Sequence, residues 1–326
     1  MIFIEKAKSV VIGHAVADAL GVPVEFMSRE ELKETPVTDM TGYGTYPVPK
    51  GAWSDDTSMS LCALDCLDKE NIDWDNIMLN FEKWLLSGEF TPTGETFDAG
   101  RTCVNAISNY FRNGLEPTQS GLIDEMSNGN GSLMRIHPFV LYLYNKEIPI
   151  EEKISVIEQA SSLTHAHERS RMACGIYAFV LWELLKKPCM DSICVGLRRA
   201  QGHYIHAKYE ERHKYTRLFH YGQWLIRKYS LERAKESLSK NEIKSSGYVV
   251  DTLEAAIWCL LTTESYEECV LKAVNLGEDT DTVAAVAGGL AGALYGYNAI
   301  PQKWRDTLIK REYIEALCDK AYKEKE

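Results

Sequence analysis

Two short acidic clusters, far apart in the chain, have the residue types and spacing of a metal site. The first is Ser54-Asp55-Asp56-Thr57 and the second is Asp279-Thr280-Asp281-Thr282. Each cluster precedes an apolar stretch, so a helix cap is the ordinary interpretation, although one cap needs only one such residue. If the two helix starts face each other, their oxygens suit Mg²⁺ or Mn²⁺, and the four carboxylates suffice for two cations. The candidate ligands are Ser54, Asp55, Asp56, Asp279, Asp281 and Thr282.

A loop rich in Gly and Asn, residues 127–135, is a second candidate for chemistry. Such loops present backbone N–H groups to phosphates. The loop matches neither a Walker nor a Rossmann fingerprint, because no Lys-Ser/Thr follows it and no strand precedes it. The pattern alone therefore leaves two interpretations open, an ordinary connecting loop or a phosphate cradle.

Two isolated carboxylates are ambiguous from the sequence. Glu25 follows Pro23, which is poorly compatible with a continuing helix, so the pattern places Glu25 on a loop as a solvated surface group. Asp98, in Phe97-Asp98-Ala99-Gly100, has the character of a helix cap.

Several other metal or diphosphate sites are disfavoured. The pairs His165/His167 and His203/His206 suggest metal ligands, but the chain has neither a His-Asp dipeptide nor His-Glu-x-x-His, which disfavours the corresponding phosphohydrolases and zincins. Asp55-Asp56 also invites comparison with helical isoprenoid synthases, whose third acidic residue would fall at Met59.

The elements that must position these residues are predicted to be helices. Apolar residues recur at helical spacing after Pro149, and Ser265 with Glu268 has the spacing of a helix cap. The apolar residues 283–297 are too few for a membrane span and form a buried helix, with glycines every four residues on one ridge. Strand signals are few. We expect an all-α fold.

Composition excludes several functional classes. The 326 residues carry a net charge of −11, without the basic footprint of a nucleic-acid or anionic-membrane partner. Charged residues interrupt the apolar positions of residues 1–20, which argues against a signal peptide. Nine cysteines, an odd number with no Cys-x-x-Cys, indicate reduced thiols and a cytoplasmic protein. The role of the segment 200–245, rich in Lys, Arg, His and Tyr, is not evident from its sequence.

Taken in order, these motifs resemble the ADP-ribosylglycohydrolase family, over roughly residues 10 to 300. The matching pieces are Gly13-x4-Asp18-Ala19-Leu20-Gly21-x-Pro23-x-Glu25-Phe26, Ser54-Asp55-Asp56-Thr57, Phe97-Asp98-Ala99-Gly100, Ser127-Asn128-Gly129-Asn130-Gly131-Ser132-Leu133-Met134-Arg135, Thr164-His165 and Asp279-Thr280-Asp281-Thr282. The resemblance implies a single-domain orthogonal helical bundle over residues 1–326, with a two-metal site holding two Mg²⁺ or Mn²⁺. It also implies hydrolysis of the bond between ADP-ribose and an acceptor, a protein side chain or a small molecule, with ADP-ribose as product.

The resemblance also implies roles for particular residues. It assigns the six oxygen ligands named above to the metals, and Glu25 and Asp98 to catalysis. Substrate contacts are implied for Gly129, Asn130, Gly131, Ser132, Met134 and His165, with Gly247 and Tyr248 as a second group. The alternative is an inactive member of the fold, binding ADP-ribose or serving a structural role like that of crystallins, against which the intact acidic residues argue. A hydrolase of a related nucleotide is a third possibility. The acceptor stays open.

Overall fold

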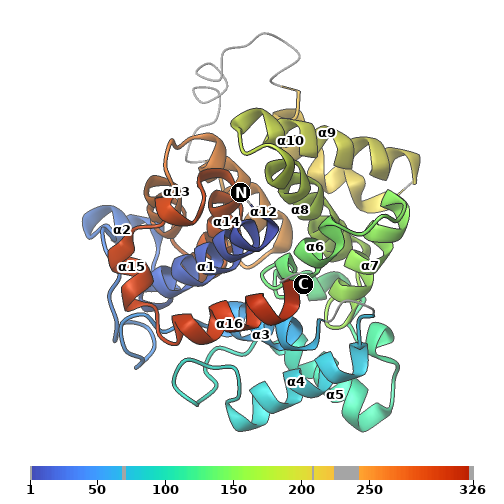
Figure 1. Ribbon diagram of the computed structural model, residues 1–326, viewed down its shortest axis with the longest axis horizontal. Helices are drawn as coiled ribbons and strands as arrows, with labels where there is room; N and C mark the ends of the chain where they lie inside the picture. Colours follow the sequence, from blue (N-terminus) through green and yellow to red (C-terminus); the bar gives the residue numbers. More distant parts are fainter. Residues whose placement is uncertain (1, 68–70, 208, 224–241, 323–326) are drawn as a thin grey trace.

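The computed structural model describes residues 2–67, 71–207, 209–223 and 242–322, and in these residues the fold is all-α, as predicted (Figure 1). The described residues form fifteen α-helices and contain no strand, only three isolated bridges. Part of the segment 200–245, residues 224–241, lies outside the described residues.

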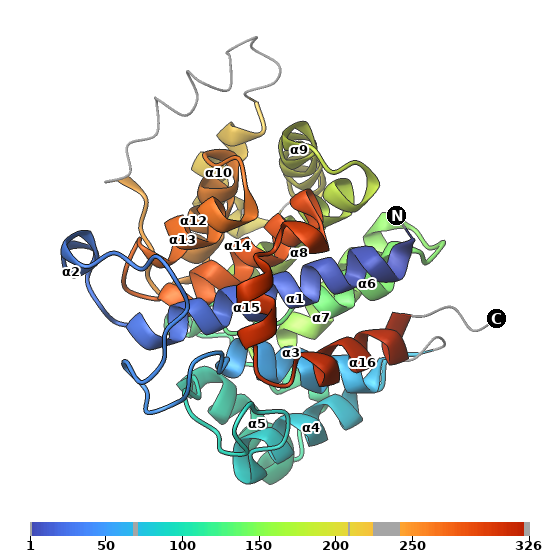
Figure 2. The same cartoon turned by 60° about the vertical axis from the view of Figure 1, so that its left-hand side comes forward.

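Two helices pack against each other at the centre of the molecule, α1 (Phe3–Gly21) and α14 (Thr280–Tyr295), and they lie side by side in both views (Figures 1 and 2). Their glycines permit this approach, because a Cβ on Gly13 would lie 2.6 Å from the carbonyl oxygen of Gly288. A Cβ on Gly292 would lie 2.0 Å from the carbonyl oxygen of Ser9. The predicted glycine ridge is thus confirmed for positions 288 and 292, whereas Gly296 ends the helix with a φ of 85°.

The other helices surround this pair. Their bounds are α2 Arg29–Glu34, α3 Asp55–Cys66, α4 Trp74–Ser87, α5 Arg101–Asn113, α6 His137–Tyr144, α7 Ile150–Ser162, α8 Glu168–Lys186, α9 Met190–His206, α10 Thr216–Tyr221, α12 Val249–Leu261, α13 Tyr266–Val274, α15 Gln302–Thr307 and α16 Arg311–Tyr322. The helices predicted after Pro149 and Ser265 are confirmed as α7 and α13. Ser265 caps α13 by accepting a hydrogen bond from the backbone N–H of Glu268.

One hydrophobic core joins the two ends of the chain, since Ala7 and Tyr322 belong to the same buried cluster. This shared core supports the interpretation of residues 1–326 as a single domain, which stays a prediction. The segment Phe3–Val24 is long and apolar enough to cross a membrane by length and composition, but 89% of its apolar window is buried inside the structure. The cysteines are free, as predicted.

Candidate active site

The first acidic cluster forms the start of α3 and is held there by a carboxylate of α1. Ser54 is the N-cap, accepting a hydrogen bond from the N–H of Asp56. Asp18 accepts bonds from the N–H and hydroxyl of Ser54, both at 2.9 Å. It also accepts bonds from the N–H and hydroxyl of Thr57, at 3.1 and 2.6 Å. Asp18 thus fixes the direction in which the two aspartates of the cluster project. Sequence analysis gave Asp18 no role, although a carboxylate inside an apolar helix is a signal of such a buried partner.

The second cluster forms the start of α14, and the two helix starts face each other. The Thr282 hydroxyl donates a hydrogen bond to Asp56 Oδ1 at 3.2 Å. The backbone N–H of Thr282 donates to Asp281 Oδ1 at 2.8 Å. Thr280 ties α14 to the end of α1 by donating to the carbonyl of Gly21 at 2.8 Å. Segments distant in the sequence are therefore joined at one acidic centre.

Glu25 joins this centre from the loop after α1. Its carboxylate lies with those of Asp279 and Asp281 in a group whose nearest oxygens are all within 4.8 Å of one another. The loop position is as predicted, but the solvated surface position is wrong, because Glu25 is only 6% exposed. Glu25 directly follows the short helical turn Val22–Val24, in which Val22 and Pro23 are buried.

A pair of backbone hydrogen bonds holds Glu25 against the start of α14. The N–H of Phe26 donates to the carbonyl of Glu278 at 2.7 Å, and the N–H of Glu278 donates to the carbonyl of Met27 at 2.7 Å. Phe26 and Glu278 both have left-handed backbones, with φ of 67° and 64°. This pairing brings Glu25 and Asp279, the neighbours of the two strained residues, to the same place.

Four carboxylates at this centre each have a buried oxygen without a hydrogen-bond partner among the described residues. These oxygens are Glu25 Oε2, Asp56 Oδ2, Asp279 Oδ1 and Asp281 Oδ2. Burial, together with the charges of Asp98 and Asp279, raises the pKa of Glu25 to about 9. Burial also raises the pKa of Asp56 and of Asp281 well above the usual range. Buried carboxylates need a proton or a cation, so hard oxygen donors with free lone pairs fit divalent metal ions such as Mg²⁺ or Mn²⁺.

A cavity of about 280 Å³ opens beside these carboxylates. Its described lining is Glu25, Phe26, Asp55, Asp98, Gly100, Arg101, Thr102, Cys103, Gly129, Asn130, Gly131, Met134, His165, Asp279 and Thr282. Asp98 is not a helix cap, because α5 begins at Arg101 with Gly100 as its N-cap. Instead it lies half-buried at the cavity with a left-handed φ of 50°, and burial raises its pKa to about 6. The cavity thus combines the acidic centre with the Gly-rich loop.

The Gly-rich loop is attached to the acidic centre by Asn130. Its side-chain amide donates to Asp279 Oδ2 at 2.8 Å and to the Thr252 hydroxyl at 2.9 Å. A Cβ on Gly131 would lie 2.9 Å from His165 Cε1, so glycine leaves the space open at this point. Gly129 and Met134 line the cavity, whereas Ser132 is fully buried and accepts a hydrogen bond from the Ser161 hydroxyl at 2.8 Å.

His165 is oriented by a buried chain of polar groups. The Thr164 hydroxyl lies 2.9 Å from His165 Nδ1, and Arg135 donates to that hydroxyl at 2.7 Å. Burial lowers the pKa of His165 to about 3, so the ring is neutral at pH 7. Sequence analysis did not single out Arg135 for this role.

Five other predicted site residues are not part of the described cavity lining, namely Ser54, Asp56, Asp281, Gly247 and Tyr248. Ser54 is occupied with Asp18. The Gly247 carbonyl accepts a hydrogen bond from the backbone N–H of Asn130 at 3.0 Å. The centroid of the Tyr248 ring lies 5.6 Å from the guanidinium carbon of Arg169. Tyr248 also forms an isolated bridge with Gly129, so both residues support the Gly-rich loop.

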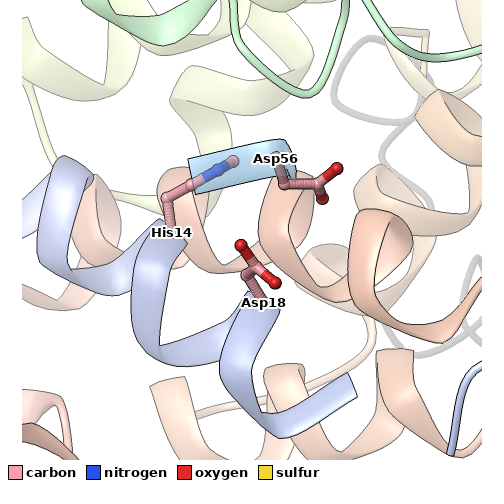
Figure 3. Close-up of side chains that lie close together, drawn as sticks. All are labelled: His14, Asp18 and Asp56. Atoms are coloured by element: carbon pink, nitrogen blue, oxygen red, sulfur yellow. The ribbon is translucent and has the colours of Figure 1, made fainter. Parts of the chain in front are cut away.

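A buried histidine lies behind the acidic centre, in a group with Asp18 and Asp56 (Figure 3). Burial lowers the pKa of His14 to about 4, and its ring contacts that of His137 at 4.4 Å between centroids. Because both oxygens of Asp18 already accept hydrogen bonds, this group supports α3 rather than forming a second cation site.

Comparisons with known proteins agree with this architecture. The family model described as ADP-ribosylglycohydrolase matches residues 1–326. The chain is 31% identical over 320 residues to an ADP-ribosylarginine hydrolase, Tri1, of Serratia proteamaculans (strain 568), covering 98% of this chain and 79% of Tri1. It is 31% identical over 316 residues to the ADP-ribosyl-[dinitrogen reductase] glycohydrolase of Rhodospirillum rubrum, covering 94% and 92%. A solved structure described as an ADP-ribosylglycohydrolase-related protein complex superposes with a TM-score of 0.78 at 30% identity, covering 98% of both chains. The chain therefore belongs to the ADP-ribosylglycohydrolase family.

Proposed function

We propose that the protein is a divalent-metal-dependent hydrolase that cleaves the glycosidic bond between ADP-ribose and an acceptor, releasing ADP-ribose. The observation that carries the proposal is the convergence of four carboxylates with unpartnered buried oxygens beside one cavity. An inactive structural member of the fold would have no need for this arrangement, because uncompensated buried carboxylates cost stability.

Two Mg²⁺ or Mn²⁺ ions fit the donor set. The residues that would hold them are Asp55, Asp56, Asp279, Asp281 and Thr282. The Ser54 hydroxyl lies at the start of the same helix as Asp55 and Asp56. When bound, such a metal pair orients the ribose hydroxyls and acts as a Lewis acid. Asp18 and Asn130 position the ligands, since their hydrogen bonds fix α3 and Asp279.

Glu25 and Asp98 are the groups placed to move protons. Hydrolysis forms a bond from a water oxygen to the anomeric carbon, breaks the bond from that carbon to the acceptor, and transfers a proton from the water to the acceptor. Glu25, buried beside the cavity with a raised pKa, is suited to exchange this proton. Asp98, which shares the lining, stabilises positive charge that develops on the ribose.

The Gly-rich loop is proposed to bind the diphosphate. Gly129 and Gly131 line the cavity and lack side chains that would keep a phosphate from their backbone. Because burial keeps His165 neutral, its ring contacts the substrate without adding charge.

An arginine side chain is the proposed acceptor. Two relatives at 31% and 30% identity are described as ADP-ribosylarginine hydrolases. A cationic guanidinium also suits Asp98, a carboxylate of the cavity lining that is not assigned to the metals.

The test is to incubate the protein with peptides carrying ADP-ribose on arginine or on serine, with Mg²⁺, with Mn²⁺ and with a chelator. We expect metal-dependent release of ADP-ribose from the arginine peptide. Saturable ADP-ribose binding without release from either peptide would instead support the inactive alternative.

A further inference from the structure

We infer that Phe26 is the platform on which the guanidinium of the acceptor stacks, and that it determines the preference of the site for planar cationic acceptors. This inference rests on the proposed function and adds a specificity residue to it.

The backbone of Phe26 is strained. Its φ of 67° lies in the left-handed region, which is uncommon for a bulky residue. The strain is maintained by the two 2.7 Å hydrogen bonds that pair this segment with Glu278. The ring gains little from the position, because Phe26 is 68% exposed. A strained backbone that presents an apolar ring to solvent indicates a role outside the protein core.

The exposed ring belongs to the reaction cavity. Phe26 is the only Phe, Tyr or Trp among the described residues that line it, and it directly follows Glu25. Since Glu25 is the proposed proton-transfer group, its neighbour lies near the bond that breaks. The adenine of ADP-ribose is at the other end of the diphosphate from that bond, so the group within reach of Phe26 is the acceptor.

The residues that line this part of the cavity suit a guanidinium. A guanidinium is planar and delocalised, and it stacks on aromatic faces while its N–H groups bind carboxylates. Asp98 lines the same cavity and supplies such a carboxylate. A neutral acceptor such as a serine hydroxyl would gain neither interaction.

Tyr43 offers a matched control. It is also an aromatic residue with a left-handed backbone, with a φ of 57°, and it is 74% exposed. It is not among the described residues that line the cavity. Replacing Tyr43 by Leu therefore removes an exposed aromatic ring of the same kind without changing the site.

The experiment compares wild type, Phe26→Leu, Phe26→Tyr and Tyr43→Leu in three measurements. These are kcat/KM for an ADP-ribosylarginine peptide, the Kd of ADP-ribose, and the Kd of agmatine, a free guanidinium compound, with ADP-ribose bound. We expect Phe26→Leu to lower kcat/KM and weaken agmatine binding by about 2- to 30-fold, the range typical of a cation–π contact. Phe26→Tyr and Tyr43→Leu should stay within about twofold of wild type. The Kd of ADP-ribose and the melting temperature should not change.

Other outcomes would overturn the inference. An equal loss of ADP-ribose affinity in Phe26→Leu would assign the ring to the nucleotide. Unchanged kcat/KM and agmatine binding would make it a solvated side chain. Failure of the proposed function is separate, because wild-type protein would then release no ADP-ribose, while agmatine binding would still report on the ring.

Discussion

Removal of divalent metal should lower the thermal stability of the protein, by an amount that grows with pH. In the metal-free protein, the folded state keeps a proton on Glu25 until about pH 9, whereas the unfolded chain releases it near pH 4.5. The stability that this proton provides is fully present below pH 4.5 and is lost as the pH rises toward 9. Asp281 contributes in the same direction, since burial raises its pKa as well.

The size of the effect follows from mass action. A metal ion at 100 times its Kd stabilises the folded state by about 2.7 kcal/mol. With an unfolding entropy of about 2.1 cal/mol/K per residue, a chain of 326 residues unfolds with roughly 0.7 kcal/mol/K. One bound ion should therefore raise the melting temperature by about 4 °C and two ions by about 8 °C.

The assay is calorimetry or dye-monitored melting in a chelator and in saturating Mg²⁺, from pH 5 to pH 9. We expect the melting temperature without metal to fall with rising pH, and the gain from Mg²⁺ to be larger at pH 8 than at pH 6. Asp281→Ala should abolish the gain. The control Asp319→Ala, which removes a surface ion pair with Lys8, should keep it. A melting temperature that Mg²⁺ and Mn²⁺ leave unchanged at every pH would refute the metal site.

Three further predictions concern single side chains. Glu25→Gln should reduce turnover about 10²- to 10⁴-fold, roughly 3 to 5.5 kcal/mol of barrier, with folding and ADP-ribose binding retained; turnover within a few-fold of wild type would remove Glu25 from catalysis. Gly131→Val should weaken ADP-ribose binding in calorimetry but not Mg²⁺ binding, because a Cβ already approaches His165 to 2.9 Å; equal losses of both would indicate misfolding. Asp18→Asn should lower the free energy of unfolding, measured in urea, by about 1 to 3 kcal/mol and should weaken Mg²⁺ binding, because the amide cannot accept hydrogen bonds from all four donors at the start of α3. Wild-type stability of this variant would contradict the role of Asp18.

Local patterns predicted much of the fold. The Ser265 cap and the amphipathic helix after Pro149 depend on neighbours within a few residues, and both are confirmed. The two acidic clusters were recognised because each holds more oxygen donors than one cap uses. The glycine spacing of α14 likewise indicated a close helix contact.

Long-range contacts were not predictable from such patterns. Glu25 is buried because Phe26 pairs with Glu278, and no local spacing encodes that pairing. The hydrogen bonds of Asp18 to α3 join residues 36 to 39 positions apart. Ser132 looks like its loop neighbours in the sequence, but it turns toward Ser161 in the core.

The packing of α1 against α14 has a consequence for how the chain is made. Thr280 and Gly21, which join the two helices, are separated by 259 positions. At about 5 to 20 residues per second, the ribosome needs roughly 13 to 50 s to add that length of chain. Throughout this interval α1, whose residues 9–21 are all buried in the folded protein, has emerged without its partner. Deletion of α14 should prolong this exposed state indefinitely, so we expect such truncated chains to aggregate or to remain bound to chaperones during translation.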